Sequence, residues 1–146
     1  MRVTYSRRLM DHFRREAKHA YPREAFAVLI GRVVGDGVQV TQLYIPDGQR
    51  EHATPLQITV ADAWLREAKR LADASGEIVL GDIHSHVIRC PLSHWREDDA
   101  PSAGDWEVAS NYIHAICYVR KYPSGRLISR ITVWPSDLNL KVLITP

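Results

Sequence analysis

The sequence predicts a single α/β domain with one mixed β-sheet flanked by helices. Amphipathic helical segments and short β-rich segments follow one another in the order α-β-β-α-β-α-β-β, which is typical of helices packed on a sheet. The chain has 146 residues, of which 45% are hydrophobic, so it is long enough to bury a core of its own. We therefore expect one domain over residues 1–146.

Two long helices are expected from apolar residues that recur at intervals of three and four positions. The first covers residues 6–20, with Ser6 as its N-cap, and Pro22 ends it. The second covers residues 61–74 and stops at a serine-glycine pair. A short third helix is expected to begin at Ser102.

Five strands are expected from short runs rich in aliphatic and β-branched residues. They cover residues 26–34, 38–45, 78–83, 113–119 and 127–134. The turn Gly35-Asp36-Gly37 joins the first two as a hairpin. The third strand leads directly into His84, and the end of a buried strand holds functional side chains rigidly.

Composition and charge exclude several classes of protein. A net charge of +2 and a pI of about 8.6 fall short of a nucleic-acid-binding surface, and the basic residues of the first helix are interpreted as a solvated face. The longest uncharged apolar run, residues 25–30, is too short to cross a bilayer, and the first residues do not resemble a signal peptide. Cys90 and Cys117 form no disulfide framework. We expect a soluble, cytoplasmic protein that binds neither nucleic acid nor membranes.

The strongest chemical signal is His84-Ser85-His86. Side chains two positions apart on a strand point to the same face, so both rings can bind one ion. Asp105 is the candidate third ligand, and three protein ligands leave a fourth position open for water, as in catalytic zinc sites. The alternatives are a pair of surface histidines and, for Ser102 and Asp105, an ordinary capped start of a helix. The capping and the ligand interpretations of Asp105 are compatible.

Glu24 lies at the start of a buried apolar run, which is an unusual place for a carboxylate. The alternative interpretation is a solvated side chain that follows the first helix.

Together these segments resemble the JAMM (MPN-plus) zinc metalloproteases of the stand-alone prokaryotic type. The resemblance rests on Pro22-Arg23-Glu24-Ala25 before a hydrophobic strand, on His84-Ser85-His86, and on Pro101-Ser102 ahead of Asp105, and it extends from about Ser6 to Trp134. It implies a cytidine-deaminase-like fold. It also implies one Zn²⁺ per chain held by His84, His86 and Asp105, with Glu24 as general base and Ser102 as a hydrogen-bond donor to the oxyanion.

The resemblance further implies the substrate. Members of the family cleave peptide or isopeptide bonds after the C-terminal tail of ubiquitin or a ubiquitin-like protein, in deconjugation or in precursor processing. The expected partner is therefore a ubiquitin-like protein or its conjugate. The main alternative is a non-catalytic MPN-type binding scaffold. A zinc nucleobase deaminase is disfavoured, because Cys90 and Cys117 are too far apart for its cysteine motif.

One departure from the family pattern affects the third ligand. The chain places 18 residues between His86 and Asp105, which is more than the pattern has, and the excess falls within residues 88–100. A longer surface loop costs little entropy, about 0.6 kcal/mol for each doubling of its length. Asp98 and Asp99 lie nearer the family spacing, but neither follows a Pro-Ser pair at the right offset, so Asp105 is preferred.

The inserted residues also contain Cys90 and His94, which lie four positions apart and are both potential zinc ligands. They indicate either an ordinary polar surface loop or a gate, in which Cys90 reaches the open zinc position or joins His94 at a second zinc ion.

Overall fold

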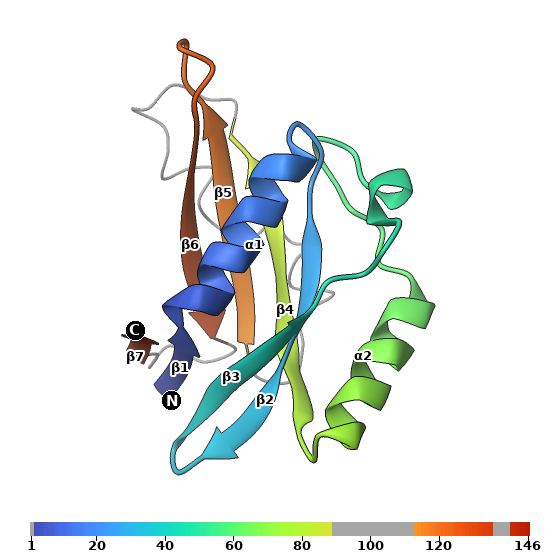
Figure 1. The fold of residues 1–146 in the computed structure, drawn as a ribbon, viewed down its shortest axis with the longest axis vertical. Coiled ribbons are helices and arrows are strands. Elements are labelled where there is room, and N and C mark those ends of the chain that lie inside the picture. Colours follow the sequence, from blue (N-terminus) through green and yellow to red (C-terminus); the bar gives the residue numbers. More distant parts are fainter. Residues whose placement is uncertain (1, 89–112, 136–140) are drawn as a thin grey trace.

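The computed structural model describes residues 2–88, 113–135 and 141–146. In this part of the chain, seven strands form one sheet in the order β6-β5-β4-β2-β3-β1-β7, with two α-helices packed on it (Figure 1). Adjacent strands are parallel in the β4–β5, β1–β3 and β1–β7 pairs and antiparallel in the other three, which confirms the predicted mixed sheet. The elements are β1 (Arg2–Ser6), α1 (Arg7–Ala20), β2 (Phe26–Val34), β3 (Gly37–Tyr44), the 3₁₀ helix η1 (Gln49–His52), α2 (Asp62–Ala74), β4 (Ile78–Val87), β5 (Ile113–Lys121), β6 (Leu127–Pro135) and β7 (Lys141–Thr145).

Two strands, β1 and β7, are absent from the sequence-based prediction. Each has five residues, and β1 pairs in parallel with both β3 and β7. A five-residue strand that runs straight into a helix has too few alternating positions to stand out, although Val3 and Tyr5 of β1 are buried. The pairing of β1 with β7 brings the two ends of the chain side by side (Figure 1).

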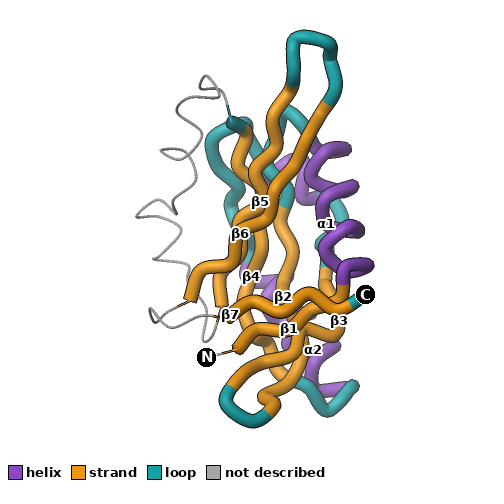
Figure 2. The backbone as a smooth tube through the Cα atoms, turned by 90° about the vertical axis from the view of Figure 1, so that its left-hand side faces the viewer, coloured by secondary structure: helices purple, strands orange, loops and turns teal. Residues whose placement is uncertain are grey.

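The first helix, α1, is confirmed together with its cap. The Ser6 hydroxyl accepts a hydrogen bond from the Leu9 backbone N–H at 3.3 Å, which satisfies one of the free donors at the helix start. The apolar stripe of α1 buries Met10, Phe13 and Ala17 against the sheet. Figure 2 shows α1 lying along one side of the strands.

Strand β2 is buried on both of its faces over its first six residues. Ala27 and Leu29 belong to the core beneath α1, whereas Phe26, Val28 and Ile30 belong to a second core on the opposite face. Because side chains alternate along a strand, this division explains why β2 reads as an unbroken apolar run.

The second core is closed by α2, which confirms the second predicted helix. Trp64, Ala68 and Ala72 pack against the β2 side chains of this second core. The helix ends at Ala74 and is followed by Gly76, whose φ of 70° is left-handed. The Glu77 N–H donates to the Ala72 carbonyl at 2.8 Å, a bond that closes the helix end. No helix in the described ranges is long and apolar enough to cross a membrane.

Strand β4 is longer than predicted. Sequence analysis ends it at Ile83, but the strand continues to Val87, so His84 and His86 lie within it and not beyond its end. The reason is the parallel pairing with β5, which covers residues 81–87 and supplies hydrogen bonds for polar and apolar residues alike. The helix predicted at Ser102 lies outside the described residues.

Candidate metal centre

Strands β4 and β5 bring four polar side chains onto one face of the sheet. Asp82, His84 and His86 alternate along β4 and therefore point to the same side, and His114 of β5 is the register partner of Asp82. This face is opposite the one covered by α1, because Ile83 between Asp82 and His84 belongs to the core beneath that helix.

The two histidines of β4, called here the histidine pair, point their outer nitrogens at each other. The Nε2 atoms of His84 and His86 lie 2.9 Å apart, and the ring centroids lie 4.8 Å apart. Two imidazole ligands of one tetrahedral zinc ion are separated by about 3.3 Å, given metal–nitrogen distances of about 2.0–2.1 Å. The pair therefore fits one zinc ion after a small adjustment, and the predicted same-face arrangement is confirmed.

Asp82 lies between His84 and His114. Its Oδ1 is 2.9 Å from His114 Nδ1, and its Oδ2 is 3.6 Å from His84 Nδ1. Burial alone would raise the pKa of the Asp82 carboxyl, but the hydrogen bond with His114 and the nearby His84 ring outweigh it and hold that pKa below its ordinary value. An ionised carboxylate is therefore available to both rings.

Asp82 and His114 are functional candidates that sequence analysis missed. Asp82 could have been found, because it precedes His84 by two positions and shares its face. His114 could not, since only the pairing of β4 with β5 shows that residues 32 positions apart meet.

Burial increases along this row of side chains. His86 is partly exposed, whereas Asp82, His84 and His114 are 6%, 6% and 2% exposed. The three buried side chains form a compact group that could hold a metal ion, with ligand atoms all within 4.8 Å of one another. The histidine pair defines a second candidate position nearer the solvent. The two positions compete for His84, because a neutral imidazole has one nitrogen lone pair to give.

Two hydrogen bonds, called here the clasp, join Ala25, which directly precedes β2, to Ser85 of β4 between the two histidines. The Ala25 N–H donates to Ser85 Oγ at 2.7 Å, and the Ser85 N–H donates to the Ala25 carbonyl at 2.8 Å. The ladder between β2 and β4 begins at the pair Phe26–His84, and just before it the Glu24 N–H donates to the Thr54 carbonyl at 3.0 Å. The Glu24 side chain is only 7% exposed, so its interpretation as a solvated residue after the helix is wrong.

The remaining predicted site residues are Ser102 and Asp105, which lie outside the described residues. The same holds for the alternative carboxylates Asp98 and Asp99 and for the inserted loop with Cys90 and His94. Their roles stay predictions.

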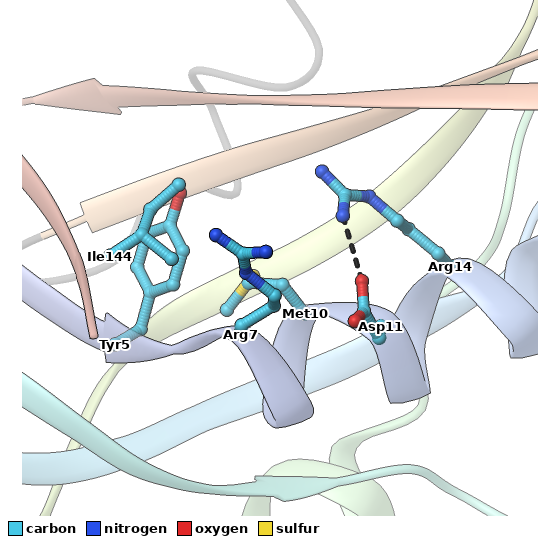
Figure 3. Close-up of a pocket in the computed structure, with 6 residues that line it drawn as sticks. All are labelled: Tyr5, Arg7, Met10, Asp11, Arg14 and Ile144. Carbon is cyan, nitrogen blue, oxygen red and sulfur yellow. Dashed lines mark hydrogen bonds and ion pairs between the residues drawn. The ribbon is translucent and has the colours of Figure 1, made fainter. Parts of the chain in front are cut away.

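A separate pocket of about 340 Å³ lies beside the start of α1 (Figure 3). It is lined by Tyr5, Arg7, Met10, Asp11, Arg14 and Ile144. The Arg14 guanidinium donates to the Asp11 carboxylate at 2.8 Å. Because α1 covers the face opposite the histidine pair, this pocket is not part of the metal centre.

Fold and side chains together define an α/β protein with a histidine-rich candidate metal centre on its sheet. The chain matches the family of prokaryotic homologs of the JAB domain over residues 6–126. This match covers most of the chain, so the protein belongs to that family, as the sequence motifs indicated.

Solved structures share the fold of this chain. A solution structure of a protein from Desulfitobacterium hafniense has a TM-score of 0.60 and 22% identity, covering 97% of this chain and 94% of that one. A solution structure of a protein from Salinibacter ruber has a TM-score of 0.56 and 25% identity, covering 90% and 80%. A JAB1/MPN domain protein from Archaeoglobus fulgidus is 20% identical over 98% and 99% of the two chains, at a TM-score of 0.49 that is too low for an inference. None of the curated proteins is significantly similar in sequence.

Proposed function

We propose that this protein is a zinc-dependent peptidase or isopeptidase that cleaves after the C-terminal tail of a ubiquitin-like protein. The observation that carries the proposal is the histidine pair, with its Nε2 atoms 2.9 Å apart. Glu24 is buried as well, and the residue after it, Ala25, is hydrogen-bonded to Ser85 between the two histidines. Membership of the JAB-domain family supports the same activity. Some MPN domains are non-catalytic scaffolds, so the activity depends on these side chains and not on the fold alone.

The residues fit a catalytic zinc ion. His84 and His86 would supply two nitrogens, and Asp105 is the proposed carboxylate ligand. A bound zinc supplies a Lewis acid for the substrate carbonyl and lowers the pKa of its water toward about 7. The partial exposure of His86 leaves this position within reach of solvent and substrate.

Glu24 is the proposed general base and acid. It accepts the proton of the attacking water and returns it to the leaving nitrogen, so the nitrogen departs as a neutral amine and not as an amide anion. The clasp between Ala25 and Ser85 fixes the backbone next to this carboxylate relative to the histidine pair. Ser102 is proposed to donate a hydrogen bond to the carbonyl oxygen as charge develops on it.

The substitution Glu24→Gln tests the proposal, because it keeps the size of the side chain and removes the proton acceptor. Suitable substrates are ubiquitin-like proteins with a diglycine tail fused to a fluorescent reporter. We expect the variant to keep its zinc while turnover falls by about 10²–10⁴-fold. Glu51→Gln in η1, at an exposed position, is the matched control and should be as active as the wild type.

Two outcomes contradict the proposal. A Glu24→Gln variant with most of its activity would remove Glu24 from the chemistry. Wild-type protein that binds no zinc and cleaves none of the fusions would favour the binding scaffold.

A further inference from the structure

Four side chains form a continuous row across β4 and β5: His114, Asp82, His84 and His86. Successive contacts measure 2.9 Å from His114 Nδ1 to Asp82 Oδ1, 3.6 Å from Asp82 Oδ2 to His84 Nδ1, and 2.9 Å between the two Nε2 atoms. Each oxygen of the carboxylate thus faces a different ring. The row ends at the position proposed for the metal.

The tautomer of His84 decides whether this residue can bind that metal. A neutral imidazole carries one proton, and the nitrogen that carries it has no lone pair for an ion. If the proton were on Nε2, the atom that faces His86 would be a donor and could not be a ligand. His84 therefore has to keep its proton on Nδ1.

We propose that Asp82, held by His114, is a positioning residue that keeps the proton of His84 on Nδ1 and so directs the Nε2 lone pair to the metal. An ionised carboxylate accepts hydrogen bonds and donates none, so it stabilises the tautomer with hydrogen on Nδ1. Metal-bound histidines commonly donate their second N–H to a carboxylate, which orients the ring and strengthens the ligand. This inference rests on the proposed function, because it takes the histidine pair as the zinc position.

His114 holds the carboxylate in place. Its Nδ1–H donates to Oδ1, which turns Oδ2 toward His84. The β4–β5 register sets Asp82 directly beside His114, and both side chains are almost completely buried, so neither can turn to solvent. Asp82 without His114 would keep its charge in the interior with one hydrogen-bond partner fewer.

The position of the row favours positioning over direct ligation by Asp82. An ion held by Asp82 and His84 Nδ1 would lie at the buried end of the row, next to a residue that is 2% exposed. It would also leave the proton of His84 on Nε2, pointing at His86. An ion at the histidine pair uses the partly exposed end and leaves the Asp82 contacts intact.

The first test uses metal-free protein and reads the tautomer of His84 by ¹⁵N-edited NMR. Wild-type His84 should carry its proton on Nδ1. Asp82→Asn keeps the shape of the side chain but leaves only one acceptor oxygen. The amide can therefore no longer accept a hydrogen bond from both His84 and His114, and the tautomers of these two rings should shift. Asp73→Asn, an exposed change on α2, is the control and should leave the spectrum of His84 unchanged.

The second test measures zinc affinity by competition with a chelator. We expect Asp82→Asn to weaken binding by about 10–100-fold, the usual effect of losing such a partner. His114→Leu should act in the same direction, whereas His114→Asn should restore tight binding, because its amide N–H replaces the Nδ1 donor. The visible spectrum of the Co²⁺-loaded protein should be the same in wild type and Asp82→Asn, since the ligands do not change.

The outcomes separate this inference from the proposed function. Unchanged zinc affinity and an unchanged tautomer in Asp82→Asn would overturn the positioning role. Loss of a ligand from the Co²⁺ spectrum of Asp82→Asn would also overturn it, in favour of direct ligation. A wild type that binds no zinc would contradict the proposed function, and the tautomer in the metal-free protein would still decide the role of Asp82.

Discussion

Replacing Ser85 with alanine should weaken the join between β2 and β4 next to the histidine pair. The Ser85 hydroxyl is fully buried and accepts the Ala25 N–H at 2.7 Å. Alanine removes the acceptor, so a buried backbone donor loses its partner, which costs about 1–3 kcal/mol of unfolding free energy. The lost volume is one oxygen atom, so a cavity adds little to this value.

Urea unfolding measures this change directly, because a domain of this size commonly unfolds in one cooperative step. Ser129→Ala in β6, where the serine is partly exposed, is the matched control and should change stability by less than about 0.5 kcal/mol. The clasp also positions the backbone beside Glu24, so Ser85→Ala should lower kcat on the fusion substrates while zinc content is retained. A variant as stable and as active as the wild type would refute the structural role assigned to this hydroxyl.

Two further predictions concern groups outside the metal centre. Burial would raise the pKa of Glu77, but hydrogen bonds from Thr41, Gln42 and Ser75 outweigh it and lower that pKa below 4.5, so ionised Glu77 stabilises the fold above this pH. Glu77→Gln should therefore be less stable than the wild type in urea at pH 7, and the difference should shrink as the pH falls below 4.5; a difference independent of pH would contradict this. Burial raises the pKa of the Cys117 thiol to about 12, so in native protein at pH 8 iodoacetamide should leave Cys117 unmodified, as read by peptide mass mapping. Rapid labelling of Cys117 without denaturant would show that this side chain is accessible.

Local patterns predicted much of the fold. The helix stripe with Ser6 as its cap and the turn at Gly35 rest on interactions between residues close in sequence, and the structure confirms both. The strands β1 and β7 were missed, because five-residue segments carry little periodicity and form through pairing with distant strands. The true end of β4 was missed for a similar reason, since the hydrogen bonds that extend this strand to Val87 come from its pairing with β5.

The same distinction applies to the site. His84 and His86 were predicted to share a face, which follows from strand geometry alone, and their Nε2 atoms meet. The contact of Asp82 with His114 depends on sheet register, which no short-range pattern contains. The sequence singled out Glu24 by its position before an apolar run but left open whether its side chain is solvated, and the structure shows that it is buried.

Zinc analysis of purified variants tests the central claim most directly, because it decides both whether the protein binds a metal and where. We expect about one zinc per chain in the wild type, nearly none in His86→Ala, and a bound but weaker zinc in His114→Leu. Wild-type protein that contains no zinc would contradict the proposed metal centre. Zinc that is retained in full by His86→Ala but lost from His114→Leu would contradict the position at the histidine pair, because it would place the metal at the buried end of the row.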